Sequence, residues 1–490
     1  MIFSILLLLG SAIASFIVYA TCLFISQCIH LKKFRGPLPI PILGNCYNTQ
    51  FLRLYGYIAN LRKKYGTVFT FFGLMKPYIV VCDPIVVRRI LSDPKSFIKG
   101  SDYTYQFAVA FGEGLVTSNG DKHRRDRATF NKYFIRSSVT KFTPSINKIT
   151  NEVMASALSA IDSSSTSMNI ESFFAALSLR VFMRFAIGTD YSADRKREEE
   201  VCHVVSKGSF AIGRSIGLGL PMWRIIPLVD LIYTSTENLL VDFRKFLKIR
   251  KAAMANGEAD GLDDCLTAMI QENMSMKEME DHYVTLISAG HDTTAFFSAY
   301  LCFLLGKHPA AQETLLAEIL SRFPLTDSPD DDDVTVTADD VAEMKFLNQV
   351  MQETLRLYSI IPQISRYSAA EVDIPEANVT IPKGANILIP LAVINRDPSI
   401  WGNDAAEFRP ERFADKGMDF TAPKQGFYPF GYSTRVCIGN TLAQIESAIF
   451  ICKLLRKYRI EQDPGFSPHI MSGISLTTSN GIHVILKKRY

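Results

Sequence analysis

Residues 430–439 read Phe430-Gly431-Tyr432-Ser433-Thr434-Arg435-Val436-Cys437-Ile438-Gly439. The segment predicts a turn that presents one cysteine, and a helical pattern begins directly after it, at Asn440. Free N–H groups and the positive end of a helix dipole lower the pKa of a thiol at such a position and stabilise a thiolate. Cys437 is therefore a candidate ligand for an iron, and Arg435 is a cation placed to bind a carboxylate of a cofactor. Taken alone, the segment also fits a buried structural cysteine.

Three other segments narrow the interpretation. Ala289-Gly290-His291-Asp292-Thr293-Thr294 interrupts a long apolar helical pattern over residues 281–305. Glu353-Thr354-Leu355-Arg356 lies in a second helical pattern over residues 342–358, and Phe408-Arg409-Pro410-Glu411-Arg412-Phe413 follows it. In this order and spacing, the four segments resemble the cytochrome P-450 family of haem-thiolate monooxygenases, in its membrane-anchored eukaryotic microsomal form. The resemblance extends over essentially the whole chain. It implies a mainly α fold with small β-sheets, in one large domain behind an N-terminal transmembrane helix.

The resemblance implies roles for residues 430–439, which we call the cysteine segment. Cys437 would be the axial thiolate ligand of haem b (iron protoporphyrin IX). Phe430 would pack on the same face of the haem and screen the sulfur from water, and Gly439 would let the backbone pass close to the porphyrin. The family usually has glycine where Ser433 stands, so this position departs from the family pattern.

Cations or other hydrogen-bond donors would hold the haem propionates. The candidates are Arg435, Arg366, and the pair His123 and Arg127. The family commonly has tryptophan at the position of His123, but an imidazole N–H can also reach a propionate. We therefore expect the role to be kept at this position.

The other face of the haem would meet the polar cluster of the long helix. Gly290 and Thr293 share one helix surface through their spacing. Gly290 would leave room for the co-substrate O2, Thr293 would offer it a hydroxyl, and Asp292 would relay protons from bulk water. The alternative is a threonine bonded to its own helix and an aspartate in an ion pair.

Glu353 and Arg356 are three residues apart on one helix face and can form an ion pair. The resemblance implies that Arg412 is the third member and that the three form a structural ion network, which positions the cysteine segment. The alternative is an ordinary surface pair, which contributes only a few tenths of a kcal/mol.

Composition excludes some classes of protein. The 490-residue chain is 48% apolar and carries 53 Lys and Arg against 49 Asp and Glu, for a formal net charge of +4. This balance does not favour a nucleic acid as a partner. The nine cysteines are scattered without a C-x-x-C pair, which is typical of a reduced, cytosol-facing protein rather than of a disulfide scaffold or a zinc site. The run Asp330 to Asp333 lacks the spacing of a calcium loop and predicts a solvated loop.

The N-terminal sequence predicts a membrane anchor. Residues 2–29 carry no charge, and a helix of about 20 apolar residues spans the hydrocarbon core of a bilayer. We therefore predict a transmembrane anchor at residues 1–30, a basic and proline-rich connector at 31–45, and the catalytic domain at 46–490. Lys32, Lys33 and Arg35 follow the apolar run, which favours a single pass through the endoplasmic reticulum membrane with the domain in the cytosol. A cleaved signal peptide is the alternative.

The first function hypothesis is a monooxygenase that inserts one atom of O2 into a sterol, fatty acid or similar lipid. Electrons would come from NADPH through a flavoprotein reductase, with cytochrome b5 as a second candidate partner. Basic residues near His123 would form a docking surface for the reductase or, alternatively, a solvated helix face: Lys122, Arg124, Arg125 and Lys132. The other hypotheses are an isomerase or peroxide-driven enzyme on the same fold, and a haem-binding sensor or electron carrier. The apolar segments 103–111, 360–364 and 474–478 are candidates for the substrate pocket.

Overall fold

The computed structural model describes residues 2–46, 54–158, 166–190, 194–218, 228–258, 263–325, 334–415 and 420–489. The predicted acidic loop at Asp330 to Asp333 lies outside these residues. In chain order the helices are α1 (Ile2–His30), α2 (Leu54–Tyr65), α3 (Pro84–Ser92), α4 (Ala108–Phe111), α5 (Gly120–Phe134), α6 (Arg136–Leu158), α7 (Ile170–Ile187), α8 (Arg195–Leu218), α9 (Leu228–Ala255), α10 (Cys265–Gln271), α11 (Met276–Lys307), α12 (Pro309–Arg322), α13 (Ala338–Glu343), α14 (Lys345–Leu357), α15 (Leu391–Ile394), α16 (Pro398–Trp401) and α17 (Asn440–Lys457). The strands are β1 (Val68–Gly73), β2 (Lys76–Val81), β3 (Phe97–Ile98), β4 (Thr166–Asn169), β5 (Ile364–Ser368), β6 (Val372–Ile374), β7 (Val379–Ile381), β8 (Asn386–Ile389), β9 (Tyr458–Gln462), β10 (Ile470–Ser472), β11 (Leu476–Thr478) and β12 (His483–Lys488).

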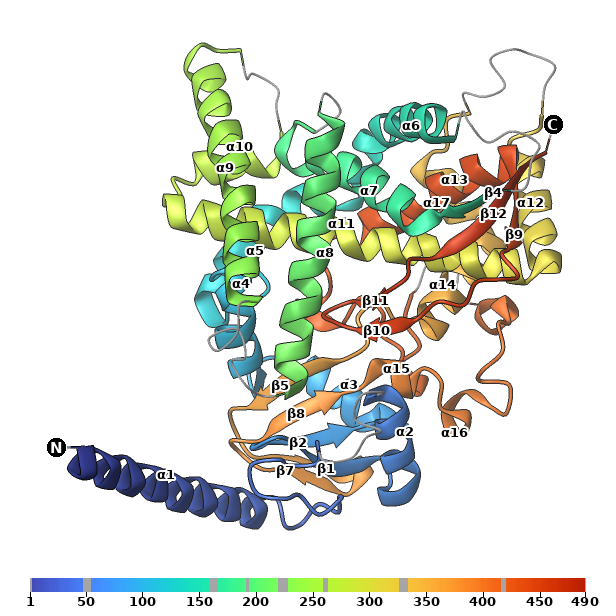
Figure 1. Ribbon diagram of the computed structural model, residues 1–490. Helices are drawn as coiled ribbons and strands as arrows, with labels where there is room; N and C mark the ends of the chain where they lie inside the picture. Colours follow the sequence, from blue (N-terminus) through green and yellow to red (C-terminus); the bar gives the residue numbers. More distant parts are fainter. Residues whose placement is uncertain are drawn as a thin grey trace.

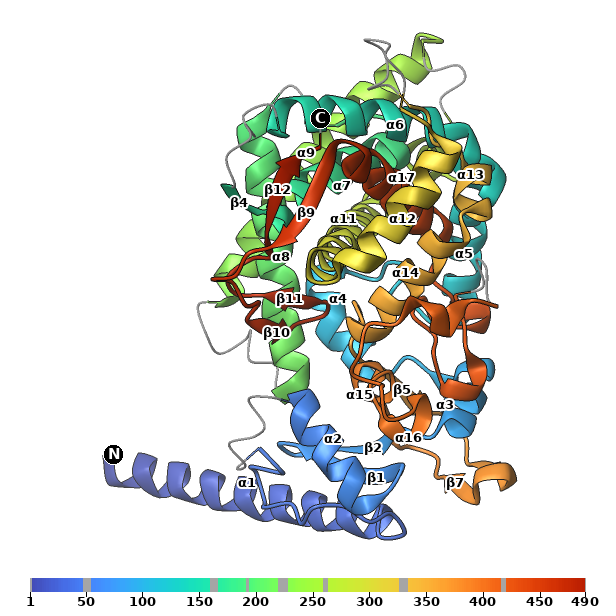
Figure 2. The same ribbon diagram turned by 90° about the vertical axis from the view of Figure 1, so that its right-hand side faces the viewer.

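Helix α11 runs through the middle of the molecule (Figures 1 and 2). It begins with a capping box, in which Ser275 and Glu278 bond each other's backbone N–H groups, and it ends before Pro309, which starts α12. Helices α7, α14 and α17 pack against it, and most of its side chains are buried. This arrangement confirms the helix predicted over residues 281–305 and extends it to 32 residues.

The largest sheet lies at one end of the molecule, close to α2 (Figure 1). Its strand order is β1-β2-β8-β5-β3, with β2 and β8 parallel and the other neighbours antiparallel. Strands β1 and β2 form an antiparallel hairpin, and Asp83 accepts hydrogen bonds from the first N–H groups of α3. The sheet therefore forms a second packing unit beside the helices.

Three smaller sheets complete the fold. Strands β4, β12 and β9 form one antiparallel sheet, β6 pairs with β7, and β10 pairs with β11 in a hairpin. Buried apolar side chains gather in two clusters, a large one around α11 and a smaller one between the main sheet and the helices α2 and α3. The expected fold class, mainly α with small sheets, is confirmed.

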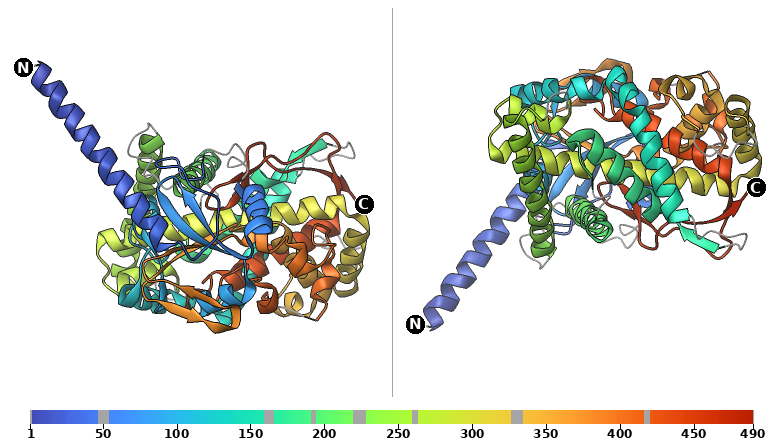
Figure 3. Two further views of the ribbon diagram at one scale, coloured as in Figure 1. Left: turned by 90° about the horizontal axis from the view of Figure 1, so that it is seen from below. Right: turned by 90° about the horizontal axis from the view of Figure 1, so that it is seen from above.

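Helix α1 extends away from the body of the molecule (Figure 3). The side chains of Phe16, Val18 and Tyr19 are exposed, whereas Phe24, further along the helix, packs on Phe72 of β1 with ring centroids 5.7 Å apart. Among the described residues, no helix has the length and apolarity needed to cross a membrane. The anchor at residues 1–30 stays a prediction.

Candidate functional site

A cavity of about 370 Å³ lies between α11, the segment before β5, the hairpin β10–β11 and the cysteine segment. Cys437 lines it, and its backbone N–H donates to the Phe430 carbonyl at 2.7 Å. This bond closes the turn that the sequence predicted, with Gly431 and Ser433 both in the left-handed region at φ 78° and 58°. Ser433 thus adopts a backbone conformation that glycine would reach without strain. This conformation gives a physical reason for the glycine that the family usually has at this position.

The pKa of Cys437 differs in direction from the sequence-based expectation. Burial raises the pKa of its thiol, while the Gly439 N–H and the Arg127 guanidinium oppose the rise. The expected helix-terminus effect is therefore present but smaller than desolvation. The accessible surface of the Cys437 side chain belongs to the wall of the cavity.

Cations surround the side of the cavity next to Cys437. Lys99, Arg366 and Arg435 line it. Burial and the charges of Arg366 and Arg435 lower the pKa of Lys99, and burial and the charge of Arg366 lower the pKa of Arg435. Burial and the positive charges of Arg435 and Lys99 lower the pKa of His123 to about 3, so this imidazole is neutral at pH 7. Among the described residues, no carboxylate forms an ion pair with Lys99, Arg127, Arg366 or Arg435.

Hydrogen bonds hold these cations at the cavity. Arg127 of α5 donates to the Val436 carbonyl at 2.7 Å, which ties α5 to the cysteine segment. Arg435 donates to the Ser118 carbonyl at 3.0 Å and Arg366 to its neighbour Ser365 at 2.8 Å. Lys99 donates to the Val116 carbonyl. Lys99 was missed in the sequence analysis because a single lysine after a short strand carries no local signal.

The residues present fit a haem. A cluster of buried and half-buried cations without ion-pair partners among the described residues favours an anion, and a haem carries two propionates within reach of one edge. Gly439 also fits, because a Cβ there would meet only Phe134, at 4.0 Å, so no protein neighbour explains the glycine. A thiol, a cation cluster and an open backbone edge on one cavity together match the donor set of a haem-thiolate site.

The α11 wall of the cavity carries Gly290, Asp292 and Thr293. Thr293 lines the cavity, but its hydroxyl donates to the Ala289 carbonyl at 2.7 Å, as in the alternative interpretation. Gly290 was expected to leave room for O2. A Cβ at Gly290 would lie 2.1 Å from the Phe182 ring of α7, so packing of α7 against α11 explains this glycine.

Asp292 is buried on the side of α11 that faces α8. Its Oδ1 accepts a hydrogen bond from the Ser206 hydroxyl at 2.7 Å, and the imidazole of the buried His291 lies 3.9 Å away. Burial lowers the pKa of His291 to about 4, so it is neutral at pH 7. Ser206 was also missed in the sequence analysis, because only the fold brings α8 next to Asp292.

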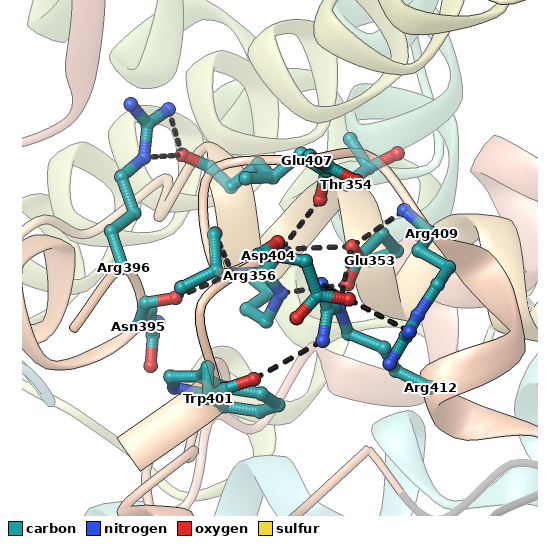
Figure 4. Close-up of polar contacts among 12 residues, drawn as sticks. Glu353, Thr354, Arg356, Asn395, Arg396, Trp401, Asp404, Glu407, Arg409 and Arg412 are labelled. Carbon is teal, nitrogen blue, oxygen red and sulfur yellow. Dashed lines mark hydrogen bonds and ion pairs between the residues drawn. The ribbon is translucent and has the colours of Figure 1, made fainter. Parts of the chain in front are cut away.

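The structure brings Glu353, Arg356 and Arg412 together in one buried network (Figure 4). Two nitrogens of Arg356 bind the two oxygens of Glu353 at 2.7 and 2.8 Å, and both side chains are fully buried. Arg412 Nε lies 3.3 Å from Glu353 Oε1. The remaining Arg356 donors bind three carbonyls of the segment that leads toward Cys437: Asn395, Ala405 and Glu407.

Acidic side chains accompany most of the predicted basic surface. Lys122 lies 3.0 Å from the buried Asp126, and Arg125 lies 2.7 Å from Glu278. Arg124 pairs with Asp121. The net positive charge of this helix face is therefore smaller than the count of basic residues suggests.

Comparisons with known proteins agree with this geometry. The model of the family described as Cytochrome P450 matches residues 34–485. The 11-oxo-beta-amyrin 30-oxidase of Glycyrrhiza uralensis is 24% identical over 459 residues, which cover 89% of this chain and 83% of that protein. Echinocystic acid 23-monooxygenase of Saponaria officinalis is 26% identical over 494 residues, covering 95% and 89%. Cytochrome P450 72A13 of Arabidopsis thaliana is 26% identical over 427 residues, covering 84% and 80%.

Replacing Arg356 by methionine should lower the free energy of unfolding by about 3–5 kcal/mol, because Glu353 would remain buried without its partner. Chemical denaturation of the purified protein measures this change. The matched control is Arg195→Met, which breaks an exposed pair with Glu199 and should change stability by less than about 1 kcal/mol. Equal losses in the two variants would contradict a structural role for the buried network.

Proposed function

The chain belongs to the cytochrome P450 family and is an oxidoreductase of the monooxygenase type, and we propose that it inserts one oxygen atom of O2 into a lipophilic substrate with electrons from an NADPH-dependent flavoprotein reductase. The observation that carries the proposal is the position of Cys437 and of three cations, Lys99, Arg366 and Arg435, on the walls of one cavity. A carrier or sensor would not need an apolar cavity on the far side of that cation cluster.

We assign the following roles to the chain's own residues. Cys437 would ligate the iron of a haem b, which supplies the activation of O2 when it is bound. Arg127, Arg366, Arg435 and the neutral His123 would hold the propionates, and we add Lys99 to this group. Phe430 would screen the sulfur from water, since it lines the same cavity as Cys437.

Proton delivery is the second part of the proposal. Thr293 would pass a proton from its hydroxyl toward O2 in the cavity, after its bond to the Ala289 carbonyl opens. Asp292 would resupply the proton from the α8 side, where Ser206 now donates to it.

A lipophilic substrate agrees with the walls of the cavity. Tyr103, Phe107 and Phe111 form a continuous aromatic row, with ring centroids 4.9 and 5.8 Å apart, and all three line the cavity. Two relatives are named for the oxidation of 11-oxo-beta-amyrin and of echinocystic acid. We propose a sterol-like, triterpenoid-like or fatty-acid-like lipid as the substrate.

The partners and the location complete the proposal. The flavoprotein reductase, with cytochrome b5 as a second candidate, would dock near α5, where Arg127 contacts the cysteine segment. Residues 1–30 would anchor the chain in the endoplasmic reticulum membrane, with residues 31–45 as the connector and residues 46–490 as the cytosolic catalytic domain. The exposed apolar side chains on α1 and at Leu38 in the connector support contact with lipid.

The reduced protein with bound carbon monoxide should absorb near the wavelength that gives the family its name. Cys437→Ala should lose this band, since no other thiol lines the cavity among the described residues. The control is Cys22→Ser, which changes an exposed cysteine on α1 and should keep the band. A Cys437→Ala protein that retains the band would overturn the assignment of the ligand.

Thr293→Ala should lower the amount of product per NADPH consumed and raise the amount of hydrogen peroxide. A loss of 1–2 kcal/mol of proton assistance would slow the productive branch about five- to thirtyfold. Thr293→Ser keeps the hydroxyl and should keep the ratio of peroxide to product. An unchanged ratio in Thr293→Ala would show that the hydroxyl only bonds to its own helix.

Membranes that contain the full-length protein should retain it through a carbonate wash, because a spanning helix is not released by high pH. Deletion of residues 1–30 should release the protein into the wash. Protease added to sealed microsomes should digest the catalytic domain of the full-length protein. Full protection of that domain would contradict the proposed topology.

A further inference from the structure

The hairpin β10–β11 places one serine, Ser475, on the wall of the cavity. Residues 473–475 form its turn and line the cavity, and Figure 1 shows the hairpin beside α8. The backbone N–H of Leu476 donates to the Ile360 carbonyl at 2.8 Å. This bond joins the hairpin to the segment before β5, which carries Gln363. Ser475 and Gln363 therefore lie on adjoining parts of one wall.

Both side chains present polar atoms that lack protein partners. Ser475 is 3% exposed, and its hydroxyl has no hydrogen-bond partner among the described residues. Gln363 Oε1 is also buried and without a partner in the same part of the chain. A buried polar atom left unsatisfied costs about 1–3 kcal/mol, so two such atoms on one wall indicate a group that binds between them.

Several other polar groups of the cavity have partners on the chain or belong to the proposed propionate site. Asp102 accepts hydrogen bonds from Lys76 and Tyr78, and the cations next to Cys437 form the proposed propionate site. The Tyr428 hydroxyl also has no partner among the described residues, but it lies just before the cysteine segment and belongs to that side of the cavity. Among the described residues, Ser475 and Gln363 are thus the ones with unpartnered polar atoms on the wall formed by the hairpin and the segment before β5.

The chemistry of the two side chains selects the class of group that fits. Neither carries a charge, so they cannot offset the desolvation of a carboxylate or an ammonium group. A serine hydroxyl donates and accepts, and a glutamine amide offers an acceptor and a donor. A hydroxyl group on the ligand could donate to Gln363 and accept from Ser475 at the same time. The neighbouring Ile361 and Ile474, which also line the cavity, favour an apolar skeleton around it.

We propose that the substrate is a lipophilic alcohol whose existing hydroxyl binds between Ser475 and Gln363. The cavity would then act on lipids that already carry one oxygen, rather than on hydrocarbons or fatty acids held by a carboxylate. The inference rests on the proposed function, because it names the substrate class of the same cavity. It implies that another enzyme supplies the hydroxyl group before this protein acts.

The test compares ligands that differ by one hydroxyl. Purified holoprotein is titrated with dodecan-1-ol and dodecane and with 5α-cholestan-3β-ol and 5α-cholestane, and dodecanoic acid tests the carboxylate class. Binding is measured from the change in haem absorption and independently from the thermal unfolding midpoint, so no turnover is needed. The measured quantity is the ratio of alcohol to hydrocarbon affinity, compared between variants so that partitioning of the ligand into solvent cancels.

For at least one pair, the wild-type protein should prefer the alcohol, and Ser475→Ala and Gln363→Leu should each lower the preference about three- to tenfold. Ser475→Thr keeps the hydroxyl and should keep the preference. Ser479→Ala changes an exposed serine just after the hairpin and should have no effect.

Two results would overturn the inference: no alcohol binds better than its hydrocarbon, or the preference survives in both Ser475→Ala and Gln363→Leu. Stronger binding of dodecanoic acid than of dodecan-1-ol would also overturn it. Absence of the carbon monoxide band in the wild-type protein would instead contradict the proposed function. In that case the ratio of alcohol to hydrocarbon affinity, measured from thermal unfolding, would still test the inference by itself.

Discussion

The site depends on the contacts that the buried guanidinium of Arg356 makes. It is fully buried, and its donors are shared between Glu353 on the same helix and the carbonyls of three residues that are distant in the chain. A buried charge is tolerated only when every donor has a partner, so the segment of residues 395–407 must wrap closely around α14. Arg412 and the Arg409 backbone N–H bind the same carboxylate and extend this constraint toward the cysteine segment. We propose that this network helps to position the cysteine segment.

The second constraint is the mutual repulsion of the cations around the cavity. Lys99, Arg127, Arg366 and Arg435 are held in place by carbonyls and amides, which satisfy their hydrogen bonds but not their charge. Burial and this repulsion lower the pKa of Arg435 to about 10. An anionic cofactor would therefore stabilise the protein by relieving repulsion as well as by adding contacts. Binding of the cofactor and stability of the fold are linked through the same four side chains.

The sequence was sufficient for features whose cause is local. The helical patterns over residues 281–305 and 342–358 and the turn around Cys437 are carried by neighbouring residues, and the structure has a helix or a turn at each. Effects of tertiary packing could not be predicted in this way. No local pattern encodes the close approach of Phe182, on another helix, to Gly290, or the burial that raises the pKa of Cys437. Lys99 and Ser206 were missed for the same reason, since each reaches its place only after the helices have packed.

Ser433 has a consequence for the stability of the turn around Cys437. Its left-handed backbone stores about 1 kcal/mol of strain that a glycine would not, and this strain is present only while the turn is closed. Relative to glycine, this strain opposes the hydrogen bond between the Cys437 N–H and the Phe430 carbonyl, which closes the turn. A glycine at this position would therefore favour the closed turn about fivefold more.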